Sequence, residues 1–326
     1  MSPGLSRASC LDKPLVSFSV EDILALVGVL EVPEPYRTES HHCFHAVEAL
    51  CLLLARYRNA GTLADLTLMY DRSTSSLTEL INSLTCYLER TWGHLLDFDH
   101  SFLLSSSRLV TYCQATQQVS RYPSLHIWAF LDCTFRGVCR PVQNQRVAYN
   151  GHFAGHALKY SALVSPDGLI VHLFGPVEGR HNDNWLLRES HLLQYCEAYA
   201  RRPDVPTTAP PGEQYMQVYG DSAYGVSHLI LSPFNTRSGG QLSAEQRQFN
   251  DTMGSLRVEV EHGFAEVLRY WPFLRMCWVM KIYWSPVGIW YRVGVLLTNA
   301  RNCLHPNQIS RRFACPPPTL EQYFHH

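Results

Sequence analysis

The sixteen residues KYSALVSPDGLIVHLF at 159–174 carry the clearest fold signal in the chain. Two apolar runs, 159–164 and 169–174, flank the turn sequence SPDG. Proline presets the backbone angle that a turn requires, and glycine tolerates a positive φ. Apolar runs on both sides of such a turn predict a β-hairpin.

Further strands and helices surround this hairpin. WAFLDCTF at 128–135 and MQVYGD at 216–221 read as short strands, and residues 184–200 and 244–274 have apolar residues at helical spacing. The order is therefore strand, strand, strand, helix, strand, helix. It predicts an α+β layer fold in which the hairpin pairs on one side of 128–135 and the fourth strand on the other.

Residues 43–117 are expected to be helical. The apolar spacing predicts one helix over Cys43–Arg56 and a shorter one over Thr62–Met69. A longer helix should follow, with Ser75 or Ser76 as N-cap and Glu79 closing a capping box. A short helix, a tight turn and a longer helix resemble a helix-turn-helix, and a helical packing domain is the alternative.

Composition limits the class of protein. Hydrophobic residues make up 46% and charged residues 17% of the 326, which is typical of a globular chain. No apolar run reaches the roughly 18 residues that a membrane helix needs, and the first residues lack the apolar core of a secretory signal. The 11 cysteines include no CxxC pair, which argues against a zinc ribbon and a disulfide framework.

Charge is distributed unevenly behind the net value of −1. Residues 1–124 hold 9 basic and 13 acidic side chains, and residues 161–234 hold 4 and 8. Residues 125–160 hold 4 and 1, and residues 235–326 hold 10 and 6. Arginine supplies 24 of the 27 basic side chains, and its planar guanidinium suits phosphate. The two basic blocks suit an anionic partner, whereas the acidic first third is poorly suited to gripping DNA.

Three carboxylates fall where separate elements of the expected sheet meet. Asp132 lies inside an apolar strand, where an unpaired charge is costly. Asp221 ends the fourth strand, and the expected sheet order makes it a neighbour of Asp132. Glu261 lies on the last long helix, which can aim it at the same point. Facing carboxylates repel each other, and divalent Mg²⁺ or Mn²⁺ relieves that repulsion.

Each of these carboxylates also has an ordinary structural interpretation. Asp132 can be a buried structural acid, Asp221 a helix N-cap and Glu261 a solvated helix residue. The spacing of the three residues does not by itself decide between the interpretations.

The motifs around these carboxylates resemble DDE transposases of the PIF/Harbinger type, particularly the transposase-like proteins common in fungal genomes. The stretches that carry the resemblance are FLDCTFRGVCRPVQNQRVAYNGH (130–152), HALKYSALVSPDGLIVHLFGPVEGRHND (156–183), YGDSAYG (219–225), LSAEQRQFNDTMGSLRVEVEHGFAEV (242–267) and VGVLLTNARNCL (293–304). The helical segment 43–117, with YRNAGTLADL and WGHLLDF, resembles the region that precedes the family's catalytic core.

The resemblance implies an α+β (mixed α/β) fold with an RNase H-like DDE catalytic core behind a helical, helix-turn-helix-like region. The expected parts are an N-terminal segment (1–40), that helical region (41–124), the DDE endonuclease domain (125–305) and a C-terminal tail (306–326). The family's acidic triad binds two divalent ions, Mg²⁺ or Mn²⁺. Its motifs match Asp132, Asp221 and Glu261, the expected catalytic residues and metal ligands, and a further aspartate matches Asp183, an expected supporting ligand.

The activity implied is that of a metal-dependent DNA endonuclease and strand transferase. Water activated between the metals cuts a strand, and the resulting 3′-hydroxyl attacks target DNA. Cys133 stands where glycine is usual, His181-Asn182 where Arg-His is common, and Ala265 where glycine is usual, but no carboxylate is lost. A catalytically silent, transposase-derived protein that binds DNA or protein stays open as an alternative, as does an unrelated enzyme that reuses the fold.

The expected partners are DNA, a second copy of the chain, and the separate Myb-like DNA-binding protein that PIF/Harbinger-type elements encode. The arginines expected to face phosphate are Arg136, Arg140, Arg146, Arg257 and Arg269. Residues 1–124 should bind duplex DNA weakly, because affinity rests largely on neutralising phosphates. The alternative is that these arginines form ion pairs with the acidic segments and do not contact DNA. The nucleus is the expected compartment, with the cytoplasm as a second one.

Overall fold

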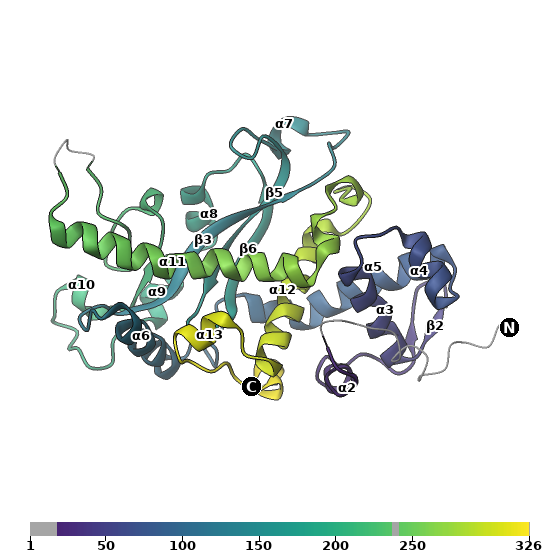
Figure 1. Ribbon diagram of the computed structural model, residues 1–326, viewed down its shortest axis with the longest axis horizontal. Helices are drawn as coiled ribbons and strands as arrows, with labels where there is room; N and C mark the ends of the chain where they lie inside the picture. Colours follow the sequence, from purple (N-terminus) through teal and green to yellow (C-terminus); the bar gives the residue numbers. More distant parts are fainter. Residues whose placement is uncertain (1–17, 237–240, 326) are drawn as a thin grey trace.

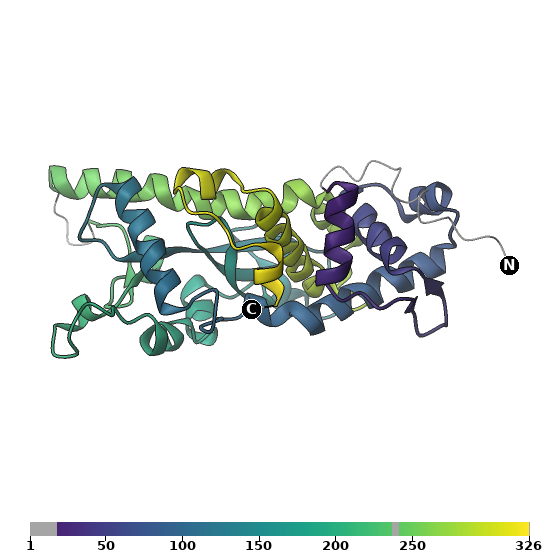
Figure 2. The same cartoon turned by 90° about the horizontal axis from the view of Figure 1, so that it is seen from below.

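The structure, a computed structural model, describes residues 18–236 and 241–325. The first seventeen residues of the expected N-terminal segment lie outside the described residues. The molecule is elongated, with a mainly helical end built from the first described residues and a part that contains the large sheet at the other end (Figure 1). The long helix near residues 244–270 runs along the sheet part and ends beside the helical end (Figures 1 and 2).

A mixed sheet of six strands forms the centre of the larger part. Its strands are β3 (Ile127–Gly137), β4 (Tyr149–Asn150), β5 (Gly155–Val164), β6 (Ile170–Glu178), β7 (Gln217–Tyr219) and β8 (Ile230–Leu231). β3 pairs antiparallel with β5 on one side and parallel with β7 on the other. β6 extends the sheet beyond β5, β8 extends it beyond β7, and β4 pairs with the start of β5. The predicted positions of the hairpin and the fourth strand on opposite sides of 128–135 are confirmed.

The hairpin between β5 and β6 is held by its own turn. Gly168 has a φ of 82°, and its N–H donates to the carbonyl of Ser165 at 2.9 Å. The buried carboxylate of Asp167 accepts hydrogen bonds from the Tyr112 hydroxyl at 2.6 Å and from the Leu169 N–H at 3.3 Å. A buried carboxylate is tolerated here because donors surround it.

The helical end contains the arrangement expected from the sequence, with one difference. Its helices are α2 (Val20–Val29), α3 (Ala46–Arg58), α4 (Leu63–Tyr70) and α5 (Thr74–Trp92), joined by a small sheet of β1 (Tyr36–Arg37) and β2 (Cys43–Phe44). The predicted capping box at Glu79 is wrong. Asp71 turns the chain with a φ of 51°, so Ser73 becomes the N-cap of α5. Glu79 instead accepts a hydrogen bond from the N–H of Ser40 at 2.7 Å.

The remaining helices cover the sheet and close the chain. They are η1 (Gly93–Leu96), α6 (Ser106–Ser120), α7 (Gln145–Ala148), α8 (Asp183–Glu189), α9 (Leu192–Tyr199), α10 (Pro211–Gln214), η2 (Ser222–Tyr224), α11 (Ala244–Tyr270), η3 (Pro272–Arg275), η4 (Cys277–Val279), α12 (Val287–Leu304), α13 (Gln308–Arg312) and α14 (Leu320–Phe324). The single helix predicted over 184–200 is two helices, because His191 adopts a left-handed backbone with φ 53°.

Helix α11 crosses one face of the sheet, and the region of α9 and α10 lies on the other side (Figure 2). Gly263 allows a close approach of α11 to β5, since a Cβ there would lie 3.2 Å from a methyl group of Val164. Successive side chains of a strand point to opposite faces. On β3, therefore, Asp132 faces α11 and Cys133 faces the side of α8.

The helical end packs directly onto the sheet part through α12. The Tyr57 hydroxyl of α3 donates to the carbonyl of Trp290 at 3.1 Å, and Arg292 of α12 forms an ion pair with Glu89 of α5. The segment expected as a tail, 306–326, is folded over its described residues, with Phe313 and Tyr323 buried. Among the described residues, no helix is long and apolar enough to cross a membrane, and no two cysteines form a disulfide.

Candidate active site

Asp132 occupies the middle of β3, next to the helix that crosses the sheet. One carboxylate oxygen accepts the N–H of Cys133 at 2.8 Å, and the other lies 3.2 Å from Nη1 of Arg257 on α11. Burial raises the pKa of Asp132 to about 6, and the nearby charge of Glu261 acts in the same direction, while the Cys133 N–H and Arg257 oppose both. This carboxylate is thus held ionised at neutral pH against an unfavourable environment.

Glu261 is joined to Asp132 through the same arginine. Arg257 and Glu261 are four residues apart on α11 and therefore share one side of the helix. Nη2 of Arg257 lies 3.6 Å from Oε1 of Glu261, whose side chain is 54% exposed. A single guanidinium thus bridges the carboxylate of the central strand and the carboxylate of the crossing helix.

Asp221 follows β7 at the same end of the sheet. Tyr219, the last residue of β7, pairs with Phe130, so Asp221 follows two residues beyond the end of β7, whereas Asp132 continues in β3 and pairs with Ala162 of β5. The Asp221 carboxylate accepts the N–H of Ala223 at 2.8 Å and caps η2. The structural interpretation of Asp221 as an N-cap is therefore correct, and it fixes the direction of the carboxylate.

Asp183 lies on the other face of the sheet. It opens α8 and forms an ion pair with Lys159 of β5, whose ammonium also donates to the carbonyl of His181 at 3.0 Å. Lys159 is only 4% exposed and lies over the Phe135 ring. The sequence reasoning missed this lysine, although a charge inside the apolar strand of the hairpin was a signal for a buried partner.

Residues 131–286 match the DDE superfamily endonuclease model. This match supports a DDE transposase-like family and suggests a transposase-type nuclease. The matched residues include all four candidate acids, Asp132, Asp183, Asp221 and Glu261. They exclude the helical end of the molecule. The chain matches no curated protein and no solved structure.

DDE endonucleases normally use divalent metals, and the donor chemistry of this site fits such ions. Carboxylate oxygens are the ligands that Mg²⁺ and Mn²⁺ prefer, and a positive group already links Asp132 with Glu261. The expected close convergence of the triad is not present, however. Across 18–236 and 241–325, no three His, Cys, Asp or Glu side chains form a group that could hold a metal. The reason is visible in the contacts, because Arg257 lies between two of the acids.

The five arginines expected to face phosphate fall into two groups. Arg136 turns inward, donates to the Tyr291 hydroxyl at 3.1 Å and lies over its ring, while Arg257 and Arg269 pair with glutamates on their own helix. Arg140 and Arg146 are exposed, and neither has a carboxylate partner within the described part of the chain. Of the five, only Arg140 and Arg146 are both exposed and without an ion pair in the described part of the chain, so they are the two open to a DNA backbone.

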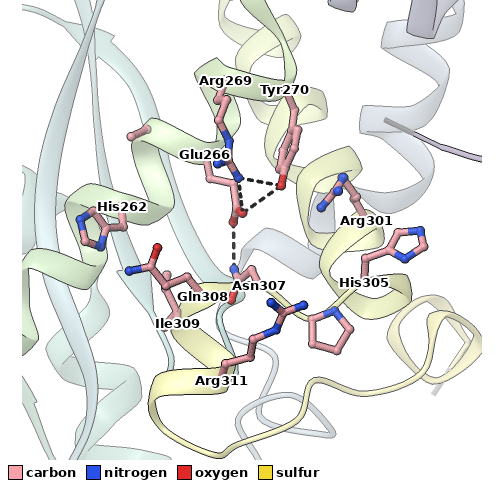
Figure 3. A pocket seen from close by; sticks show the side chains of 12 residues that line it. His262, Glu266, Arg269, Tyr270, Arg301, His305, Asn307, Gln308, Ile309 and Arg311 are labelled. Atoms are coloured by element: carbon pink, nitrogen blue, oxygen red, sulfur yellow. Dashed lines mark hydrogen bonds and ion pairs between the residues drawn. The ribbon is translucent and has the colours of Figure 1, made fainter. Parts of the chain in front are cut away.

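A second charged region lies on the opposite flank of α11, around a cavity of about 400 Å³ that α12 and α13 help to line (Figure 3). Glu266 is five residues beyond Glu261, which is about 140° around the helix. Its carboxylate accepts hydrogen bonds from Asn302 at 3.0 Å, Asn307 at 2.8 Å and the Tyr270 hydroxyl at 3.2 Å. The Figure 3 cavity is therefore a separate place from the DDE site.

Proposed function

We propose that the chain is a PIF/Harbinger-type DDE transposase, or a nuclease derived from one, that cuts DNA strands. The observation that carries this proposal is that the residues matching the DDE endonuclease family place Asp132 on β3, Asp221 directly after β7 and Glu261 on the helix that packs against β3. The sheet supports an RNase H-like core, since an antiparallel β6–β5–β3 half continues into the parallel strands β7 and β8.

Each acid has a role that follows from its contacts. Asp132, Asp221 and Glu261 would hold two divalent ions, which supply activation of water and stabilisation of the leaving oxygen of a phosphodiester. The Cys133 N–H orients Asp132, and the Ala223 N–H orients Asp221. Lys159 neutralises Asp183, whose helix α8 reaches η2 through a hydrogen bond from the Asn184 side chain to the Ala223 carbonyl at 2.8 Å. Asp183 therefore supports the loop that carries Asp221.

Nicking of supercoiled plasmid tests the proposal. The full chain should nick DNA with Mg²⁺ or Mn²⁺, and EDTA should stop the reaction. Asp132→Asn should abolish nicking, because the variant loses a first ligand rather than an outer partner, whose loss alone costs about 10- to 100-fold. Asp251→Asn is the matched control, since Asp251 is an exposed aspartate on α11.

A catalytically silent, DNA-binding protein is the second candidate. It is favoured by the position of Arg257, which occupies the space between Asp132 and Glu261 with a fixed charge. A full chain that binds DNA but leaves plasmid intact at every Mg²⁺ and Mn²⁺ concentration would establish this candidate. Nicking that disappears in Asp132→Asn would exclude it.

We also propose that the protein acts in the nucleus together with a separate Myb-like protein and a second copy of the chain. This proposal rests on the PIF/Harbinger assignment, since such elements encode a separate DNA-binding partner. Imaging of a fluorescent fusion and copurification with a coexpressed Myb-like protein test it. A fusion confined to the cytoplasm when the partner is coexpressed would contradict it.

A further inference from the structure

An apolar groove lies beyond the end of β3. Figure 1 shows α7 at this end of the sheet. Its volume is about 680 Å³, and its walls are residues 139–143 and 281–284. The Cys139 N–H donates to the Met280 carbonyl at 3.0 Å, and the Asn144 side chain donates to the Tyr283 hydroxyl at 3.1 Å. Hydrogen bonds between the two walls give the groove a defined shape.

Large apolar side chains stand open to solvent in and beside this groove. Trp284 is 82% exposed and Tyr283 is 54% exposed, and Val142 on the facing wall is 85% exposed. Trp278, whose carbonyl accepts a hydrogen bond from Cys139, is also exposed. A gathering of exposed aromatic residues marks a binding surface more often than a solvent face.

The charged residues that line the groove, Arg140 and Lys281, are both basic. The sequence has no Asp or Glu between Asp132 and Asp167, and none between Glu266 and Glu321, and the two walls come from these two stretches. Arg140 and Lys281 line the groove, and Arg146 lies next to Arg140. None of these three cations forms an ion pair in the described ranges; Arg140 bonds to the neutral amide of Gln145 at 2.9 Å. The occupant that complements this surface is therefore anionic and flat.

We propose that this groove binds an unpaired nucleobase of the DNA strand, with Trp284 and Tyr283 as stacking faces and with Arg140 and Lys281 on the flanking phosphates. Aromatic faces combined with a basic rim are what single-stranded nucleic acid requires. From Asp132 to Gly137, where β3 ends, the strand spans five residues, or about 16 Å, and the groove begins two residues later at Cys139. One strand can thus reach both places. This inference rests on the proposed function and adds the form of substrate, an end with unpaired bases.

The test measures binding, so it is independent of cutting. The full chain in an Asp132→Asn background is titrated with fluorescein-labelled oligo(dT), with a duplex of the same length, and with an abasic oligonucleotide that keeps the phosphates. Trp284→Ala should weaken oligo(dT) binding by about 5- to 150-fold, the range found for one stacked base. Trp284→Phe should retain most of the affinity. Leu68→Ala is the control, since Leu68 is equally exposed, at 87%, but lies on α4.

Three results would overturn the proposal. In the first, Trp284→Ala binds oligo(dT) as tightly as Leu68→Ala does. In the second, the abasic strand binds as tightly as oligo(dT), which would mean that phosphates alone are recognised. In the third result, Trp284→Ala changes the sedimentation of the protein from dimer to monomer without changing oligo(dT) affinity, and the groove is then an interface between copies. Absence of plasmid nicking together with base-dependent binding would remove the nuclease assignment and leave the groove assignment standing.

Discussion

The two flanks of α11 carry glutamates in opposite situations. On one flank, Glu266 is 10% exposed, and both carboxylate oxygens are hydrogen-bonded, to Tyr270 and Arg269 on the same helix and to Asn302 and Asn307 on the chain that packs against it. On the other flank, Glu261 is 54% exposed and has one distant partner, Arg257. One helix therefore presents a fully satisfied acid and an acid that keeps its oxygens available.

The difference separates a structural carboxylate from a reactive one. A buried charge is stable only when donors fill its coordination sphere, and Glu266 meets that requirement with two amides, a tyrosine hydroxyl and a guanidinium. Asp132 and Glu261 share a single guanidinium instead, and burial and mutual repulsion act on Asp132. Groups held in this way lower stability and remain available to a ligand, which is typical of functional sites.

The largest expected effect is on activity, at the open flank. Glu261→Gln should lower the Mg²⁺-dependent nicking rate by more than about 100-fold, because it removes a proposed metal ligand. Its free energy of unfolding should stay within about 0.5 kcal/mol of the parent, as is usual for exposed positions. Plasmid nicking and urea unfolding on one preparation measure both, and Glu245→Gln on the first turn of α11 is the control. A Glu261→Gln variant that nicks at the parental rate removes Glu261 from the site.

The buried flank should show the reverse pattern. Glu266→Ala should destabilise the protein by about 1–3 kcal/mol, because it leaves the buried amides of Asn302 and Asn307 without their acceptor. The nicking rate per folded molecule should change little. Urea denaturation followed by intrinsic fluorescence gives the free energy of unfolding. The same measurement gives the folded fraction under assay conditions, by which the nicking rate is divided. A stable Glu266→Ala variant with lost nicking would reverse the roles assigned to the two glutamates.

Asp132 should give a pH-dependent signature. Its pKa is raised by burial from 3.8 to about 6, so the folded protein binds a proton more tightly than the unfolded chain does. The contribution of Asp132 to the free energy of unfolding is therefore fully present below pH 4 and is lost as the pH rises through 6. In EDTA, Asp132→Asn should therefore stabilise the protein at pH 7.5, by up to about 3 kcal/mol, and by little at pH 4. Parallel urea titrations at both pH values measure this, and an equal effect at both would contradict it.

The smallest effect concerns two exposed arginines from sequence blocks of opposite net charge. Arg146→Ala should reduce the slope of log affinity for duplex DNA against log salt by about 1, because this exposed arginine has only phosphate to neutralise. Arg37→Ala, an exposed arginine in the acidic first part of the chain, should leave the slope unchanged. A salt titration of the full chain is preferred to one of residues 1–124, because α3 and α5 bury their contacts against α12. Equal slopes for both variants would place the DNA elsewhere.

Local patterns were sufficient to predict most of the sheet. The SPDG turn specifies the hairpin through the local backbone preferences of proline and glycine, which do not depend on the rest of the chain. The apolar runs define β3 and β7. The break at His191 could not be predicted, since the apolar spacing of 184–200 continues through it. Nor could the packing of Phe313 and Tyr323, because a proline-rich segment reads as irregular even when its aromatic residues are buried.

The acids of the site were found from position and family motifs, but their partners were not. Arg257 was read as a phosphate contact, and the structure places it between Asp132 and Glu261. Lys159 went unnoticed although it neutralises Asp183. Such pairs join residues that are 24 to 125 positions apart, and they depend on how α8 and α11 lie on the sheet. Sequence spacing contains no information on that geometry.

The packing of the helical end onto α12 has a consequence during synthesis on the ribosome. Tyr57 meets Trp290 across 233 residues, and the His325 ring meets the Val29 carbonyl across 296. At 5–20 residues per second, the first helices wait roughly 10 to 60 seconds before these partners are made. During that interval the surface of α3 and α5 that packs against α12 stays uncovered. The helical end therefore completes its native packing only after α12 has been made.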